Sequence, residues 1–262
     1  SLRCFRELED VEGLANALTN LGAVRAELES RYAEARALSE ESVRLYRKLG
    51  DIWGLSYALN NLGEVLVAQH LPVLARACFE ESLAIARRHK NAYGIGFAHL
   101  ELGNLAWHEQ DFAKACEAYE IALDSFRVDG NTWHIALALQ CLARTTQSME
   151  DDCQAAAYYA DSLALHWEVQ IKHCLPMSLA GLAYLAARAG RMNRAAVLQG
   201  ANDALIATIE FGMGLFYADR LLYESNVTAT RNLVTSAEHR AWYAEGQCTR
   251  LEDVVVLAAS QQ

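Results

Sequence analysis

The sequence predicts an all-α fold: a right-handed α-α superhelix of about five helical hairpins of 40 residues, closed by a C-terminal helical cap. The first observation is a repeat, because alanines recur at a constant interval, at Ala35, Ala75, Ala115, Ala155 and Ala195. The second is composition, because hydrophobic residues make up 53% of the chain and it holds only two prolines. Helices propagate where alanine is common and proline is rare, so the repeated unit is helical.

The best-defined unit runs over residues 54–103. Leu59, Leu62, Gly63 and Leu66 form the pattern L-x2-L-G-x2-L, and Ala75 with Phe79 forms A-x3-F. Together these two patterns resemble the two-helix signature of the tetratricopeptide repeat. The resemblance implies a solenoid of stacked helical hairpins.

The first helix of each hairpin carries a stripe at i, i+3 and i+4 that ends in a residue with little or no side chain. The five stripes are Leu18-Leu21-Gly22, Leu59-Leu62-Gly63, His99-Leu102-Gly103, Leu139-Leu142-Ala143 and Leu179-Leu182-Ala183. Residues at this spacing share one face of a helix. We expect the small residue to let the partner helix approach closely.

The second helix of each hairpin also carries residues three and four apart on one face. They are Ala35-Ser39-Ser42, Ala75-Phe79-Ser82, Ala115-Tyr119-Ala122, Ala155-Tyr159-Ser162 and Ala195-Gln199-Asn202. Most of these side chains are small, so we expect them to fit the crowded seam between neighbouring hairpins.

The helix ends are marked by capping residues. Good N-caps stand at the repeat boundaries, at Asp10, Asp51, Asn91 and Asn131. Gly50 and Gly130 precede two of them, where a C-cap requires a residue that tolerates positive φ. Pro72 is expected to start a helix, and Pro176 is expected to delay or kink the fifth first helix.

The domain organisation follows from where the repeat pattern holds. Residues 1–10 are interpreted as the end of a preceding repeat, 11–210 as the solenoid and 211–262 as the cap. Because the sequence begins without a methionine, we expect a segment of a longer protein. The stretch 210–214 is expected to break the pattern, and helices are expected over 215–234, 235–246 and 250–259. Thr249 and Glu252 have the spacing of a capping box for the last one.

Charge and cysteine usage limit the partners. Lys and Arg number 23 against 33 Asp and Glu, which gives a formal net charge of −10. This charge repels nucleic-acid phosphates and anionic lipid, so we expect this segment to bind no nucleic acid and no membrane. The seven cysteines form no C-x-x-C pair, and no signal peptide is recognisable, so a cytoplasmic location is expected.

Patterns typical of catalysis and of cofactor binding are missing from the sequence. His99, Glu101 and His108 share one helix and His166 lies seven positions before His173, but no H-E-x-x-H motif or Cys/His quartet is present. There is also no G-x-S-x-G elbow and no G-x4-G-K-[ST] phosphate loop. We therefore expect a protein that is not an enzyme and holds no metal or other cofactor.

Two stretches carry a second resemblance. They are residues 45–69 and the C-terminal set Trp242, Glu245, Gly246, Leu251, Glu252 and Asp253. With the constant repeat spacing, they resemble the C-terminal repeats of bacterial STAND-type signal-transduction ATPases and of LuxR- or SARP-type transcriptional regulators. The resemblance implies a sensor module whose ATPase, and often a DNA-binding domain, lies elsewhere in the protein. The alternative is a stand-alone tetratricopeptide-repeat adaptor or a peptide-signal receptor.

A candidate binding groove is expected along the first helices, which line the concave side of such arrays. Its main candidate residues are Tyr57, Asn60, Glu64, Asn104, Trp107, His108, Gln140, Arg144 and Tyr184. Further positions on the same face are Asn16, Thr19, Ala23, Phe97, Leu100, Gln147 and Arg188. Amides both donate and accept hydrogen bonds, and aromatic faces supply contact area, so the groove suits an extended peptide, a protein or a small-molecule effector such as a polyol. The alternatives are that the parent protein's own domains fill it, or that Phe97 and Leu100 only pack between hairpins.

Three of these residues are expected to form a ladder. Asn60, Asn104 and Arg144 lie on successive first helices, with Trp107 one turn further along. An extended peptide could bridge the ladder, with an exposed Arg144 pairing with a carboxylate of the ligand. The alternative is that Arg144 pairs with Glu64 or Glu101 and serves the fold.

Overall fold

The computed structural model describes residues 2–27, 31–209 and 217–260, and these residues form helices and no strand. The chain divides into two compact units, Ser1–Asp129 and Gly130–Gln262. The fold class is all-α and built from helical hairpins, as predicted.

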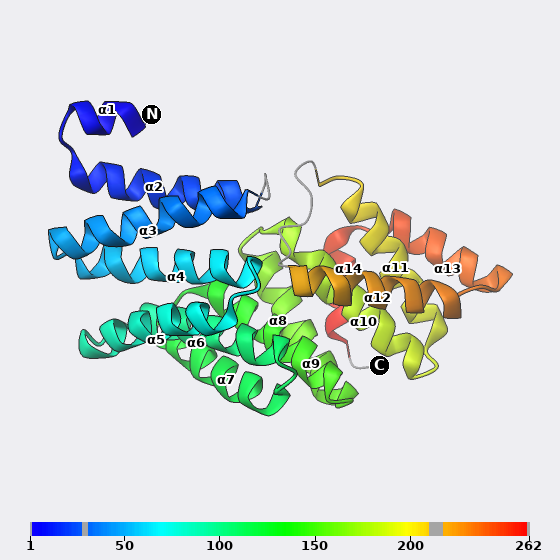
Figure 1. Ribbon diagram of the computed structural model, residues 1–262. Helices are drawn as coiled ribbons and strands as arrows, with labels where there is room; N and C mark the ends of the chain where they lie inside the picture. Colours follow the sequence, from blue (N-terminus) through cyan, green and yellow to red (C-terminus); the bar gives the residue numbers. More distant parts are fainter. Residues whose placement is uncertain (1, 28–30, 210–216, 261–262) are drawn as a thin grey trace. The chain divides into compact units, whose positions relative to one another are not determined.

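The first unit contains three hairpins after a short leading helix (Figure 1). Its helices are α1 (Leu2–Glu7), α2 (Val11–Glu27), α3 (Tyr32–Leu49), α4 (Ile52–Ala68), α5 (Pro72–Arg88), α6 (Ala92–His108) and α7 (Phe112–Asp129). Helices α2, α4 and α6 are the first helices of the hairpins, and α4 contacts both of the others. One face of this unit is therefore formed by first helices alone.

The second unit contains two hairpins and three further helices. They are α8 (Thr132–Ser148), α9 (Asp152–Glu168), the 3-10 turn η1 (Lys172–Cys174), α10 (Leu175–Arg188), α11 (Met192–Ile206), α12 (Tyr217–Leu233), α13 (Ala237–Cys248) and α14 (Leu251–Ala259). Pro176 stands in the first turn of α10, which has 14 residues where α8 has 17. The predicted late start of this helix is confirmed.

Glycine and an aromatic ring form the contact inside two hairpins. A Cβ atom built on Gly63 would lie 2.3 Å from the ring of Phe79, and one on Gly103 would lie 2.6 Å from the ring of Tyr119. Any side chain at these glycines would displace a ring that is fully buried. The close approach predicted from the leucine-glycine stripe is confirmed.

The serines of the second helices form hydrogen bonds inside their own hairpins. Ser42 Oγ donates to the carbonyl oxygen of Ala15 at 2.9 Å, and Ser162 Oγ donates to that of Ala136 at 2.9 Å. Each bond joins the two helices of one hairpin. Ser162 Oγ also accepts a hydrogen bond from Ser178 Oγ of α10, the first helix of the next hairpin, at 3.5 Å. Ser162 therefore lies at the seam between hairpins, as predicted, and also contacts its own partner helix.

The N-caps predicted at Asp51, Asn91 and Asn131 are present. Asp51 accepts hydrogen bonds from the amides of Trp53 and Gly54, while Asn91 and Asn131 each cap their helix in the same way. Pro72 stands in the first turn of α5. Left-handed residues occur at regular intervals, at Gly50, His70, Lys90, Gln110, Gly130, Glu150, Gln170 and Gly190. Only the glycines at 50 and 130 were expected from the sequence.

The C-terminal helices differ from prediction in one cap. Thr249 Oγ1 donates to the carbonyl oxygen of Glu245 at 2.8 Å, and no side chain caps α14. The predicted capping box at Thr249 is therefore wrong, because this hydroxyl bonds back to the end of α13. A capping box instead opens α13, where Ser236 and His239 exchange hydrogen bonds. The break predicted at 210–214 lies outside the described residues.

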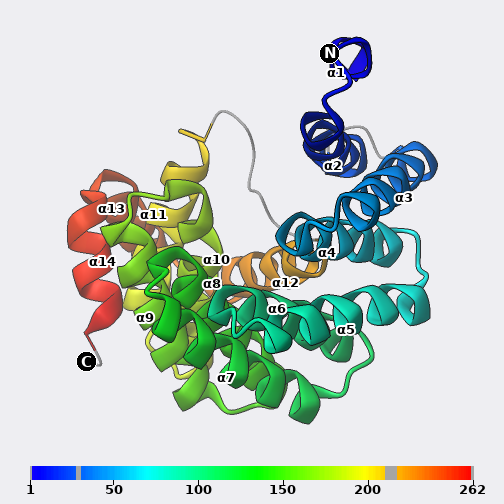
Figure 2. The same ribbon diagram turned by 90° about the vertical axis from the view of Figure 1, so that its left-hand side faces the viewer.

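Helices α13 and α14 cover the second helices of this unit. In Figure 2, α14 lies beside α9 and α13 lies beside α11, and both pairs are in contact. Val254 and Ala258 of α14 are buried in the core formed by α9, α10 and α11. This is the kind of cover that a terminal hairpin requires.

Candidate ligand groove

The predicted groove residues come from four helices and form one set in each unit. Helices α4 and α6 of the first unit carry Tyr57, Asn60, Glu64, Asn104, Trp107 and His108. Helices α8 and α10 of the second unit carry Gln140, Arg144 and Tyr184. The two sets have different surroundings.

A cavity of about 200 Å³ lies between α4 and α6 in the first unit. It is lined by Trp53, Ser56, Tyr57, Asn60, Asn91, Tyr93, Gly94 and Phe97. Trp53 and Tyr57 are 54% and 48% exposed, which is unusual for aromatic rings of this size. The cavity thus brings two predicted residues, Tyr57 and Asn60, together with aromatic side chains from the neighbouring hairpin.

Asn60 is one of the polar residues that line this cavity. Only 5% of Asn60 is exposed, and its Oδ1 accepts no hydrogen bond from the residues that the structure describes. Leaving a buried amide oxygen without a donor costs about 1–3 kcal/mol. Such an atom in a cavity wall is suited to a ligand that donates a hydrogen bond.

Asn104 serves the fold through its side chain. Its Oδ1 accepts a hydrogen bond from the Tyr119 hydroxyl at 2.8 Å, and its Nδ2 donates to Glu101 at 3.3 Å. Asn16 does the same in the first hairpin, where it accepts from the Tyr46 hydroxyl at 2.7 Å. These asparagines join the two helices of a hairpin.

The other predicted residues of α6 divide between core and surface. Leu100 is buried, so it belongs to the core, as the alternative interpretation held. Phe97 is partly buried and lines the cavity. The Trp107 ring lies edge-on to the exposed His108 at 5.7 Å and is tilted against Phe112 at 6.4 Å.

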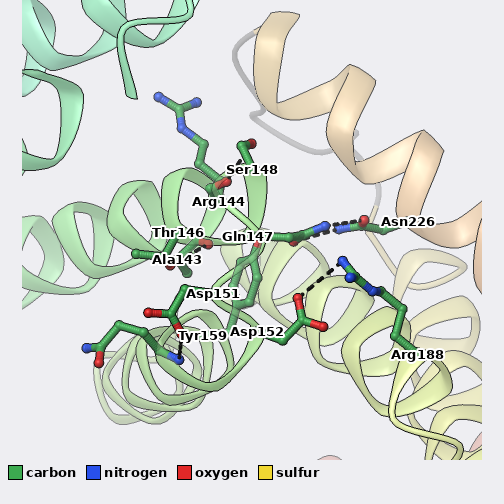
Figure 3. Close-up of polar contacts among 11 residues, drawn as sticks. Ala143, Arg144, Thr146, Gln147, Ser148, Asp151, Asp152, Tyr159, Arg188 and Asn226 are labelled. Carbon is green, nitrogen blue, oxygen red and sulfur yellow. Dashed lines mark hydrogen bonds and ion pairs between the residues drawn. The ribbon is translucent and has the colours of Figure 1, made fainter. Parts of the chain in front are cut away.

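The predicted residues of α8 are buried. Gln140 is 4% exposed and Arg144 is 2% exposed, so the prediction of an exposed arginine is wrong. Gln147, one turn further along, accepts a hydrogen bond from the Tyr159 hydroxyl at 3.0 Å and donates to Asn226 Oδ1 at 2.7 Å (Figure 3). Asn226 belongs to α12, so a helix from the C-terminal region packs on the first helices of this unit.

Helix α12 covers the same face of the second unit that is open in the first. Met177 and Ala180 of α10 hold the repeat positions that Tyr57 and Asn60 hold three hairpins earlier. Both pack in one buried cluster with Tyr223 and Val227 of α12. The sequence carried a signal for this contact, because buried residues of α12 follow the i, i+3, i+4, i+7 pattern of an amphipathic helix. These residues are Tyr223, Asn226, Val227 and Thr230.

Tyr184 lies at the end of α10 beside Arg188. The Arg188 guanidinium is 5.8 Å from the centre of the Tyr184 ring, and its Nη1 pairs with Asp152 Oδ1 at 3.2 Å (Figure 3). Arg188 therefore joins α9 to α10.

A second cavity, of about 480 Å³, lies between α11 and α12 and contains the ion pair of Asp203 and Arg231.

Two buried histidines of the second unit have altered acidity. Burial lowers the pKa of His134 to about 4, and burial followed by the nearby charge of His173 lowers the pKa of His166 to about 4. Both rings are therefore neutral at physiological pH.

Among the described residues, no group of three His, Cys, Asp or Glu side chains is placed to hold a metal ion. In the same part of the chain, no helix is long and apolar enough to cross a membrane.

Comparison with known proteins supports this interpretation of the fold. Residues 13–88 match the Tetratricopeptide repeat family. This stretch contains most of α2 and all of α3, α4 and α5. Repeats of this kind stack into surfaces that bind proteins, and the match indicates an interaction module and no enzyme family.

Solved structures share the fold at low sequence identity. The crystal structure of BtubC (BKLC) from P. vanneervenii has a TM-score of 0.64 at 18% identity, over 86% of this chain and 89% of that chain. The apo form of RapI has a TM-score of 0.57 at 14% identity, over 88% of this chain and 84% of that chain. A search of curated proteins finds no significant match.

Proposed function

We propose that this chain is a non-enzymatic sensor module that binds a peptide or a protein segment on the open first-helix face of its first unit. The observation that carries the proposal is the aromatic cavity between α4 and α6, with the buried Oδ1 of Asn60 in its wall. The formal charge of −10 argues against nucleic acid or anionic membrane as the partner. A cytoplasmic location is part of the same proposal.

The size of the cavity favours one side chain of a larger ligand. Sites for drug-sized molecules usually have volumes of roughly 300–1,000 Å³. The cavity of about 200 Å³ is smaller, so it suits a single anchoring residue while the rest of a peptide lies along the exposed first helices. Exposed Trp and Tyr rings are the residues that most often supply binding energy at interfaces.

A selection from a random peptide library, displayed on phage and panned against the purified chain, tests the proposal. We expect enriched peptides whose affinity falls about tenfold or more when Trp53 is replaced by alanine. Trp133→Ala is the matched control, because Trp133 holds the same repeat position two hairpins later. The proposal fails if no peptide is enriched, or if both substitutions reduce affinity equally.

We also propose that the module belongs to a bacterial signal-transduction regulator, of the transcriptional kind with a STAND-type ATPase. The resemblance of residues 45–69 and of the W-x-x-E-G tail supports this assignment, and Gly246 of the tail lets α13 pack directly against the backbone of α11. Sequencing the complete gene tests it, because a G-x4-G-K-[ST] motif should be encoded upstream. A gene that encodes only the repeats would instead support the second candidate, a stand-alone adaptor or peptide-signal receptor. The extent of the similarity to RapI, over 84% of that chain, favours this candidate.

A further inference from the structure

The cavity between α4 and α6 offers a hydrogen-bond acceptor, while three of the backbone donors around it are already used. The amides of Trp53 and Gly54 donate to Asp51 at 3.0 and 3.1 Å, and the amide of Gly94 donates to Asn91 at 3.1 Å. They are among the first-turn amides that would otherwise attract an anion to a helix N-terminus. The Asp51 carboxylate also offsets the positive end of α4.

Two of the hydroxyl groups at the cavity are used as well. Ser56 Oγ is bonded to Ser82 Oγ at 2.8 Å, and the Tyr57 hydroxyl donates to Asn20 Oδ1 at 3.4 Å. Asn60 Oδ1 remains as a buried acceptor without a donor among the described residues. A ligand that satisfies this oxygen must therefore donate a hydrogen bond to it.

The walls of the cavity favour a positive charge on that donor. Four of the eight lining residues are aromatic and none is charged. Burial raises the pKa of Tyr93, and its interactions with Tyr57, Asp129 and Glu64 raise it further, so two acidic side chains act on this wall. Aromatic faces attract cations through their quadrupole, and more strongly where water is displaced.

We propose that this cavity binds the cationic side chain of a lysine or arginine in a peptide ligand. The ammonium or guanidinium group donates a charge-assisted hydrogen bond to Asn60 Oδ1, and its aliphatic stem packs on Trp53 and Tyr57. This inference rests on the proposed peptide-binding function and names the residue that anchors the peptide. It also matches the surplus of acidic residues in the chain.

Three small probes test the inference on the purified chain. They are the N-acetyl methylamides of lysine, norleucine and glutamate, which compare a cation, a neutral stem and an anion. We expect the lysine probe to shift the indole N–H resonance of Trp53 and to bind about tenfold more tightly than the norleucine probe. Equal binding of norleucine, tighter binding of glutamate, or no shift with the lysine probe would overturn it.

Two variants separate this site from a general effect on folding. Asn60→Leu introduces the residue that stands at the same repeat position in the next hairpin, Leu100, so the helix accommodates it. We expect this variant to lose the preference for lysine over norleucine. Tyr57→Ala removes a half-exposed ring and should weaken lysine binding at an unchanged melting temperature. Trp133→Ala should bind the lysine probe as the unmodified chain does.

The peptide selection distinguishes failure of this inference from failure of the function. Enriched peptides that lack lysine and arginine at a common position would leave the peptide-binding function standing and refute the cationic anchor. If no peptide is enriched and no probe shifts the Trp53 resonance, both proposals fail.

Discussion

Gly246 of α13 lies directly against the backbone of Val197 in α11, where a Cβ atom would be 2.0 Å from the carbonyl oxygen of Val197. Gly200 of α11 has the reciprocal relationship with Tyr243, at 2.1 Å. The two helices therefore meet backbone to backbone. We expect Gly246→Ala to lower the free energy of unfolding by about 3 kcal/mol or more, because a backbone carbonyl cannot move aside as a side chain does. Chemical denaturation measures this, with the exposed Ala244→Ser as control. If Gly246→Ala lowers the free energy of unfolding by less than Ala244→Ser does, the backbone contact is contradicted.

Gly63 makes a softer contact, with the ring of Phe79. Gly63→Leu should overpack the α4–α5 hairpin and cost about 1–3 kcal/mol of stability. Phe79→Ala in the same chain should recover part of that loss, because it removes the ring that the leucine displaces. Thermal melts of the two single variants and the double variant measure the coupling, and strict additivity would show that the two residues do not meet.

Gly50 isolates the contribution of the backbone conformation. Its φ is 71°, and a Cβ atom there would meet nothing within 4 Å. Gly50→Ala should therefore lower stability by about 1 kcal/mol through the left-handed conformation alone. Lys90→Gly, at the equivalent turn with φ of 55°, should not lower stability. Equal losses in both variants would contradict this account.

Stability should fall in acid because of two buried histidines. The pKa values of His134 and His166 are about 4 in the folded chain and about 6.5 when unfolded, so the unfolded state binds protons first. Above about pH 6.5 both histidines are neutral in the folded and in the unfolded chain, so their titration does not change stability. Below about pH 6.5 stability falls as the pH is lowered, until the folded histidines are protonated near pH 4. The full loss is roughly 3 kcal/mol per histidine. His166→Leu should make the free energy of unfolding, measured by chemical denaturation, less dependent on pH between 6.5 and 4. If the slope of stability against pH is unchanged in this variant, the role of His166 is contradicted.

The hydrogen bond between Gln147 and Asn226 should hold α12 on the second unit. A double-mutant cycle with Gln147→Leu and Asn226→Leu should give a coupling of about 0.5–3 kcal/mol, because each single variant leaves a buried amide without its partner. The control pair is Arg220 and Glu224, an exposed ion pair within α12 that should couple by less than about 1 kcal/mol. A coupling near zero for Gln147 and Asn226 would show that this bond does not stabilise α12.

The hairpins and their caps could be predicted because each depends on residues close in sequence. Asn91 caps the amide of Gly94 in the first turn of the same helix, and Gly63 meets a ring of the very next helix. The burial of Gln147 could not be predicted in this way, because its partner Asn226 lies far along the chain, on α12. The repeat pattern correctly placed Arg144 on a first helix, yet periodicity does not show what covers a helix face, and so the expected exposure was wrong.

Part of the candidate site was visible in the sequence. Tyr57 and Asn60 were identified from their positions beside the leucine-glycine stripe, and both line the cavity. Trp53 and Tyr93 were missed, although they hold equivalent positions in successive hairpins, at the starts of α4 and α6. A search for aromatic residues at the repeat spacing would have found them.

The left-handed residues that recur from Gly50 to Gly190 make the turns at which they stand interchangeable with one another. The chain changes direction through the same backbone conformation whether the residue is glycine, lysine, histidine, glutamate or glutamine. A duplication or excision that starts and ends at equivalent turns therefore adds or removes one whole hairpin and keeps every remaining helix in register. Arrays built in this way can change length in evolution, or by engineering, without redesign of the helices that stay.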